Sequence, residues 1–111
     1  MGENVRSEIF RDGLLEGRVV VLSGAGTGLG REAALEMVRL GAKVIGCGRR
    51  QEPLEETATL AEGKRGSFSF STLDIRDEEA VDSFIERVVA DHDRIDVLVN
   101  NAGGQFLSPA E

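Results

Sequence analysis

The 111-residue sequence contains no tyrosine and no tryptophan, and it has only one cysteine, one histidine and two prolines. Without tyrosine, the chain has no phenol group that could act as a general acid or base. The single cysteine, Cys47, excludes an internal disulfide and suits a reducing compartment, so we expect a cytoplasmic protein. No apolar run approaches the length of a membrane span, and the charged residues 1–18 do not resemble a secretory signal.

Basic residues are outnumbered by acidic ones. The chain has 13 lysines and arginines against 20 aspartates and glutamates, which gives a net charge of −7. This balance disfavours nonspecific binding to nucleic acid and to anionic membrane surfaces. We therefore expect a single α/β domain whose partners include neither nucleic acid nor a membrane.

The most informative feature that the sequence does have is a glycine-rich turn between a predicted strand and a predicted helix. Residues 19–22 are aliphatic, the turn carries Gly24, Gly28 and Gly30, and apolar residues then recur at helical spacing up to Gly41, namely Leu29, Ala33, Met37 and Leu40. Glycine permits positive φ and close approach to a ligand, and the following helix aims free N–H groups at an anion. An isolated glycine turn is more often a flexible surface loop, but the flanking strand and helix favour binding of a pyrophosphate.

Strands and helices continue to alternate along the chain. We expect strands at residues 43–47, 67–73 and 95–99, and the alternating pattern of residues 67–73 suits a sheet edge. One intervening helix is predicted with Pro53 in its first turn, Leu54, Ala58 and Ala61 on one face, and Gly63 past its end. A second is predicted after the cap residue Asp77 from the apolar pairs Ala80/Val81, Phe84/Ile85 and Val88/Val89.

This order of elements predicts an α/β fold with a doubly wound parallel sheet of the Rossmann type and strand order 3-2-1-4. It would form a partial NAD(P)-binding domain over residues 18–111, preceded by an arm at residues 1–17. Two crossover helices would lie on one face of the sheet and only the third on the other. Because apolar sheet would stay exposed and the fourth strand would be an open edge, we expect only the first half of such a domain.

The end of the second predicted strand bears on cofactor preference. A site selective for NAD usually has an acidic residue about 20 residues past the glycines, to bind the ribose 2′-hydroxyl. Here that place falls near Gly48, and Arg49 and Arg50 follow. Because a missing acid removes repulsion toward a 2′-phosphate and guanidinium groups bind phosphate, we expect NADP rather than NAD. The alternative is that the two arginines begin a solvated helix.

Two motifs together resemble the short-chain dehydrogenase/reductase family over about residues 18–111. They are Ser23-Gly24-x3-Gly28-x-Gly30, close to the family's TGxxxGxG turn with Ser23 in place of threonine, and Asn100-Asn101-Ala102-Gly103, the family's NNAG strand end. The resemblance implies that the pyrophosphate and adjacent ribose contact the turn, namely Ser23, Gly24, Thr27, Gly28, Leu29 and Gly30. It also implies that Asp74, with the backbone of Ile75, binds the adenine amino group.

The same resemblance places Asn101, Ala102 and Gly103 along the nicotinamide ribose, whereas Asn100 is expected to tie the fourth strand to its neighbour. The family's chemistry uses a serine, a tyrosine and a lysine downstream of the NNAG strand. This chain has no tyrosine and ends eleven residues after Asn100. We therefore expect no catalytic residue and no metal site in it, with His92 solvated and Cys47 a small core residue.

Residues 103–110 and the arm segment 9–15 resemble the enoyl-CoA and dienoyl-CoA reductase branch of that family. The resemblance implies the NADP(H)-binding part of a short-chain oxidoreductase, with an acyl-CoA substrate in the intact relative and a homo-oligomer left open. Two alternatives remain. One is a catalytically inert, truncated dinucleotide-binding module that acts as a sensor or partner subunit, and the other is a fragment made by a premature stop.

Overall fold

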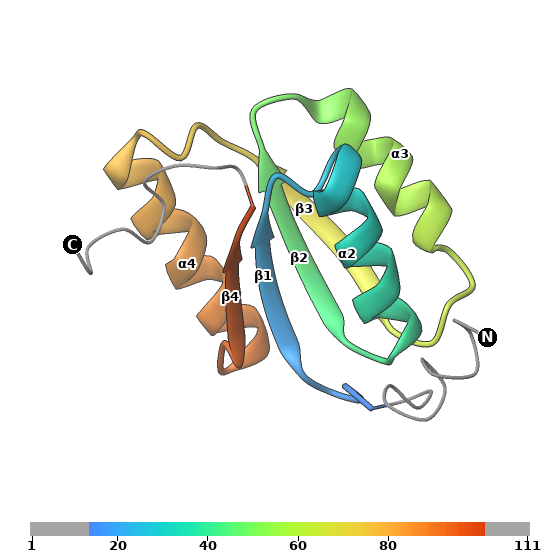
Figure 1. Cartoon of the computed structure of the whole chain (residues 1–111). Helices are drawn as coiled ribbons and strands as arrows, with labels where there is room; N and C mark the ends of the chain where they lie inside the picture. The colour runs from blue at the N-terminus through green and yellow to red at the C-terminus, as the bar shows by residue number, and fades with distance from the viewer. Residues whose placement is uncertain (1–13, 102–111) are drawn as a thin grey trace.

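A computed structural model describes residues 14–101, which form a four-stranded parallel sheet with helices on both faces (Figure 1). The strands run in the order β3-β2-β1-β4, and this confirms the predicted Rossmann-type topology. Residues 1–13 and 102–111, and with them most of the predicted arm, lie outside the described range. The elements are β1 Val19–Ser23, α2 Gly28–Arg39, β2 Lys43–Gly48, α3 Gln51–Ala61, β3 Ser67–Thr72, α4 Glu78–His92 and β4 Val97–Asn100.

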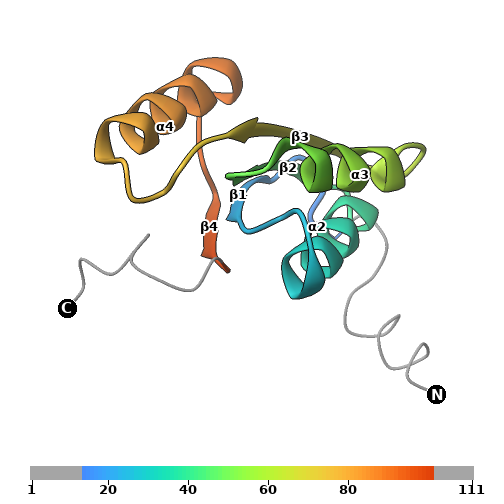
Figure 2. The same cartoon turned by 90° about the horizontal axis from the view of Figure 1, so that it is seen from above.

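The sheet separates two apolar layers, because successive side chains of a strand point to opposite faces. Helices α2 and α3 cover one face and α4 covers the other, as predicted (Figure 2). Val20 and Leu22 of β1 pack in the layer under α2 and α3, whereas Val19 and Val21 pack toward Phe84 of α4. All of these side chains are at most 2% exposed. The central strand β1 is therefore buried on both faces, which explains its continuous aliphatic sequence.

Helix α2 turns a different stripe toward the sheet from the predicted one. The helical positions that are fully buried are Gly30, Ala34 and Val38, whereas Ala33 and Met37 are only partly buried. Leu29, which the helical spacing groups with Ala33 and Met37, is 76% exposed and does not belong to the buried stripe. The first turn of α2 lies near the carboxyl ends of the strands (Figure 1). The predicted stop after Leu40 is confirmed, since Gly41 has φ +103°.

The other two helices follow the sequence signals closely. Pro53 lies in the first turn of α3, and Leu54 and Ala61 are buried as predicted. Between them the chain buries Thr57 rather than Ala58, which is only partly covered. The carboxylate of Asp77 caps α4 by accepting a hydrogen bond from the backbone N–H of Ala80 at 3.2 Å, as expected of an N-cap aspartate.

The predicted open edge is present at β4. Val97 and Leu98 are 40% and 36% exposed, high values for aliphatic residues of a strand. An apolar groove of about 410 Å³ is lined by Leu14, by Val97 and by Met37 of α2. At the opposite edge, Phe68 and Phe70 of β3 are half-buried, which fits the alternating pattern of that strand. In residues 14–101, no helix combines the length and the apolar character needed to cross a bilayer.

Candidate functional site

The glycine-rich turn comprises residues 24–30: residues 24–27 connect β1 to α2 at the carboxyl edge of the sheet, and residues 28–30 begin the helix. From β1 the chain moves outward to β2 and β3, and it then crosses back to β4 on the other side of β1. Strand order therefore reverses between β1 and β4. In open α/β sheets, ligands bind outside the carboxyl ends of the strands at such a reversal. The turn lies at this position.

The glycines of the turn serve different physical purposes. Gly24 and Gly28 have φ +70° and +56°, in the left-handed region that favours glycine. A Cβ on Gly28 would meet no protein atom within 4 Å, so this backbone faces open space. A Cβ on Gly30 would lie 1.7 Å from the carbonyl oxygen of Gly24 and 2.7 Å from Nδ2 of Asn101. Gly30 thus lets the start of α2 pack directly against the turn.

Within the described residues, no side chain caps the N-terminus of α2 and no acidic side chain of its first turn balances the helix dipole. Thr27 is the N-cap residue, but its side chain makes no capping hydrogen bond, and the first turn carries no acidic residue. The first N–H groups of a helix have no partner inside the helix, and they coincide with the positive end of its dipole. The open backbone at Gly28 and these donors together fit a phosphate group, which is the fit that the glycine spacing predicts.

The start of the turn is fixed to the two neighbouring strands. The N–H of Gly24 donates to the carbonyl of Cys47 in β2 at 2.9 Å. The hydroxyl of Ser23 donates to Oδ1 of Asn100 at 3.0 Å and accepts from the N–H of Asn101 at 3.1 Å. These contacts confirm that Asn100 ties β4 to its neighbour. They also place Asn101, the one residue of the predicted nicotinamide-ribose group that is described, beside the turn, whereas Ala102 and Gly103 lie outside the described residues.

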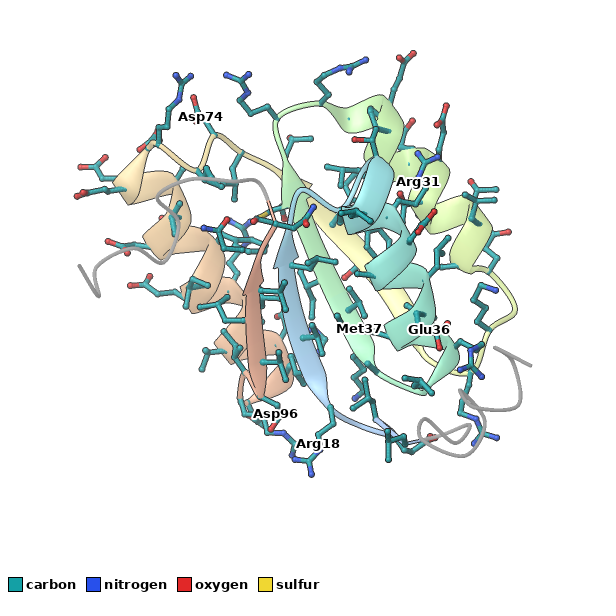
Figure 3. The ribbon with its side chains drawn as sticks, in the orientation of Figure 1. Arg18, Arg31, Glu36, Met37, Asp74 and Asp96 are labelled. Atoms are coloured by element: carbon teal, nitrogen blue, oxygen red, sulfur yellow. The ribbon has the colours of Figure 1, made fainter. Side chains whose placement is uncertain are left out.

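Two residues at the back of the turn were not predicted. Thr57 of α3 is fully buried, and its hydroxyl donates to the carbonyl of Ala25 at 2.9 Å. Arg31 of α2 donates from Nε to the Thr57 hydroxyl at 3.0 Å and from its Nη2 to the carbonyl of Pro53 at 3.0 Å. Figure 3 shows Arg31 between the two helices. The signal in the sequence is a threonine on the otherwise apolar stripe between Leu54 and Ala61, although it does not reveal the partner.

A group of charged residues lies at the same edge of the sheet, where β2 and β3 end. Arg49 and Arg50 follow β2 and are exposed, and Asp74 follows β3. Arg76, which was not predicted, binds the Asp74 carboxylate from Nε at 3.1 Å and from Nη2 at 2.9 Å. The hydrogen bonds from the Arg76 side chain and from its backbone N–H lower the pKa of Asp74 to about 2, and Arg49 adds a smaller electrostatic effect. This low pKa keeps Asp74 ionised at neutral pH, hydrogen-bonded to Arg76 and close enough to Arg49 to feel its charge.

The remaining predicted residues fall on either side of this edge. The side chain of Ile75 packs against the apolar layer under α4. Leu29 is exposed beside the turn.

Cys47 is buried, and burial raises the pKa of its thiol to about 11, as expected of a core residue and not of a nucleophile. His92 is the half-buried last residue of α4. Residues 14–101 contain no group of three or more histidine, cysteine, aspartate or glutamate side chains that could hold a metal ion.

Both the sequence and the fold match known proteins. The short chain dehydrogenase family profile matches residues 18–111. A probable 2,4-dienoyl-CoA reductase of Bacillus subtilis is 34% identical over 97 residues, which cover 87% of this chain and 38% of that protein.

Solved structures give the same result. The citronellol catabolism dehydrogenase AtuB of Pseudomonas aeruginosa superposes with a TM-score of 0.81 at 42% identity, over 93% of this chain and 43% of that one. A metagenomic short-chain oxidoreductase in complex with NADP gives a TM-score of 0.78 at 36% identity, over 81% of this chain and 41% of that one. The chain spans less than half the length of each of these three proteins.

Proposed function

The chain belongs to the short-chain dehydrogenase family, whose members bind nicotinamide dinucleotides, and on that premise we propose that residues 23–30 hold the pyrophosphate of NADP(H) as part of a short-chain oxidoreductase. The observation that carries this proposal is the turn itself. It combines open backbone at Gly28, an uncapped helix N-terminus and a position at the strand-order reversal. When bound, the dinucleotide supplies the hydride chemistry, and these residues bind and orient it.

The proposal also assigns cofactor contacts to Asn101, to Asp74 and to the backbone of Ile75. Asn101 lies beside Ser23, at the end where the proposal puts the nicotinamide ribose. Asp74 and the backbone of Ile75 follow β3, where the proposal puts the adenine. Between these two ends lies the turn, so the dinucleotide would extend along the carboxyl edge of the sheet from β3 across β2 and β1 to β4.

For selectivity we assign the 2′-phosphate to Arg49 and Arg50. Both are exposed where β2 ends, and no acidic residue occupies that end, since Gly48 is the last residue of the strand. A charge-assisted hydrogen bond contributes about 1.5–3 kcal/mol, which corresponds to at least about tenfold in affinity. The neighbour solved in complex with NADP supports the same choice.

Thermal unfolding with each cofactor tests the selectivity. We expect NADPH to raise the Tm of the full chain more than NADH does at equal concentration, because ligands that bind only the folded state stabilise it. Arg49→Ala should remove the difference. Lys64→Ala is the matched control, because it removes one exposed positive charge at the far end of α3 and should leave the difference intact. Equal Tm shifts with the two cofactors in the unaltered chain would contradict the NADP assignment.

For the whole protein we propose an unsaturated acyl-CoA as the substrate class, following the dienoyl-CoA reductase of Bacillus subtilis. For this chain taken alone we make a second proposal: it binds the cofactor without catalysing reduction, because its 111 residues contain no tyrosine. An assay of NADPH oxidation with an enoyl-CoA, using the purified chain, tests the second proposal. Binding without turnover supports a binding module, and steady turnover would refute it.

A further inference from the structure

The turn proposed to hold the pyrophosphate is supported from behind by a buried polar contact between two helices. Thr57 of α3 is fully buried although it is polar. Buried polar groups persist only where they are hydrogen-bonded. Its hydroxyl has three acceptors within reach: the carbonyl oxygens of Ala25 at 2.9 Å, Pro53 at 3.2 Å and Gly26 at 3.5 Å. Two of these three belong to the turn.

Arg31 decides which way the hydroxyl hydrogen points. Its Nε donates to Oγ1 of Thr57 at 3.0 Å, so the oxygen is the acceptor on that side and its own hydrogen must point elsewhere. The nearest acceptor is the carbonyl of Ala25. Arg31 is itself held by the carbonyl of Pro53 at 3.0 Å and by the carboxylate of Glu56 at 2.9 Å.

The orientation of the Ala25 carbonyl fixes the next donor in the turn. No peptide bond in the described chain is cis. In a trans peptide the C=O of one residue and the N–H of the next point in opposite directions. Because the Ala25 carbonyl points toward Thr57, the N–H of Gly26 points away from α3. The Thr57 hydroxyl also makes a longer contact with the Gly26 carbonyl, and this contact turns the N–H of Thr27 away from α3 in the same way.

We propose that Thr57 and Arg31 are positioning residues that hold the amide N–H groups of the glycine turn in the orientation that binds the pyrophosphate. The hydrogen bonds run in one direction, from the Arg31 guanidinium to the Thr57 hydroxyl, to the Ala25 carbonyl, and through that peptide to the Gly26 N–H. Hydrogen bonds in such a chain polarise one another, so the positive charge of Arg31 strengthens the final donor. This inference rests on the proposed function, since it assigns a role toward the same ligand.

Isothermal titration of NADPH and of inorganic pyrophosphate into full-chain variants tests the proposal. Thr57→Val keeps the shape of the side chain and removes the hydroxyl, and it should weaken both ligands roughly three- to tenfold. Thr57→Ser keeps the hydroxyl and should bind like the unaltered chain. Phe84→Leu, on the opposite face of the sheet, is the control for a general loss of stability and should not change the affinity.

A second pair of variants keeps the test decisive if Thr57→Val fails to fold. Arg31→Met should weaken binding in the same direction, whereas Arg39→Met, at the other end of α2, should not. The amide resonance of Gly26 in NMR spectra without ligand should move in Thr57→Val and Arg31→Met and stay in place in Thr57→Ser. Affinities of Thr57→Val and Arg31→Met equal to that of the unaltered chain would overturn the inference alone. Failure of the unaltered chain to bind NADPH would overturn the proposed function and the inference with it.

Discussion

The hydroxyl of Ser23 donates to Oδ1 of Asn100 at 3.0 Å, and so joins the carboxyl ends of two adjacent strands that lie 77 residues apart in the chain. The same hydroxyl accepts from the N–H of Asn101, and Ser23 is fully buried. One side chain therefore closes β1 against β4 at the point where the strand order reverses. This contact fixes the position of Asn101 relative to the glycine turn.

Ser23→Ala should destabilise the fold by about 1–3 kcal/mol, because it removes the two hydrogen bonds of the buried hydroxyl and each contributes about 0.5–1.5 kcal/mol. Urea unfolding measures this difference. Ser69→Ala, in the exposed row of β3, is the matched control and should change stability by less than about 0.5 kcal/mol. Equal free energies of unfolding for the two variants would show that the Ser23–Asn100 hydrogen bond does not stabilise the fold.

Two glycines of the turn should differ in how much alanine destabilises the fold at their positions. Gly28→Ala should cost only about 1–2 kcal/mol, since φ +56° is strained for alanine but no protein atom is displaced. It should nevertheless weaken NADPH binding, because the new methyl group enters the open side of the turn.

Gly30→Ala should unfold the chain at a much lower temperature than Gly28→Ala, because its Cβ would meet the Gly24 carbonyl at 1.7 Å and backbone would have to move. Thermal unfolding of both variants, with titration of whichever remains folded, measures the contrast. The opposite order of stability would contradict the packing described for the turn.

The hydrogen bonds from the Arg76 side chain make the largest contribution to the low pKa of Asp74. Arg76→Gln should raise that pKa from about 2 toward the ordinary aspartate value of about 4, because it removes the main hydrogen bonds to the carboxylate. An NMR titration of the side-chain carboxyl carbon measures the change. Arg49→Gln is the control and should move the pKa less, since Arg49 acts on Asp74 only through space. A larger effect at Arg49 would reverse this attribution.

Asp96 should make folding sensitive to acid at the opposite end of the sheet (Figure 3). Its pKa is lowered first by the hydrogen bond from the N–H of Val19 at 2.8 Å and then by Arg94. Because the pKa is lower in the folded than in the unfolded chain, the stabilisation is complete above the unfolded value of about 3.9 and is lost as the pH falls below it.

The variant Asp96→Asn should therefore flatten the decline of the Tm between about pH 5 and pH 2. Asp82→Asn, which alters an exposed aspartate of α4, should leave that decline unchanged. An unaltered slope in Asp96→Asn would show that other carboxylates govern the acid sensitivity.

The sequence predicted the features that depend on local chemistry or on strand order. The cap at Asp77, the stop at Gly41 and the topology follow from residue types at fixed spacing, and the link from Asn100 follows from the family resemblance. Helical spacing grouped Leu29 with Ala33 and Met37, but spacing alone does not say which residues of a stripe the sheet covers, and Leu29 is exposed. Thr57 and Arg31 were missed because their contact depends on how α2 packs against α3, which no local pattern contains.

The measurement that tests the central claim most directly is an NMR titration of the backbone amides of the full chain with NADPH and then with inorganic pyrophosphate. The account predicts that both ligands shift the amide resonances of residues 24–30 in a saturable manner, because those N–H groups receive the phosphate oxygens. NADPH should in addition shift the resonances that follow β2 and β3. A folded chain in which the amides of residues 24–30 do not respond to either ligand would contradict the account.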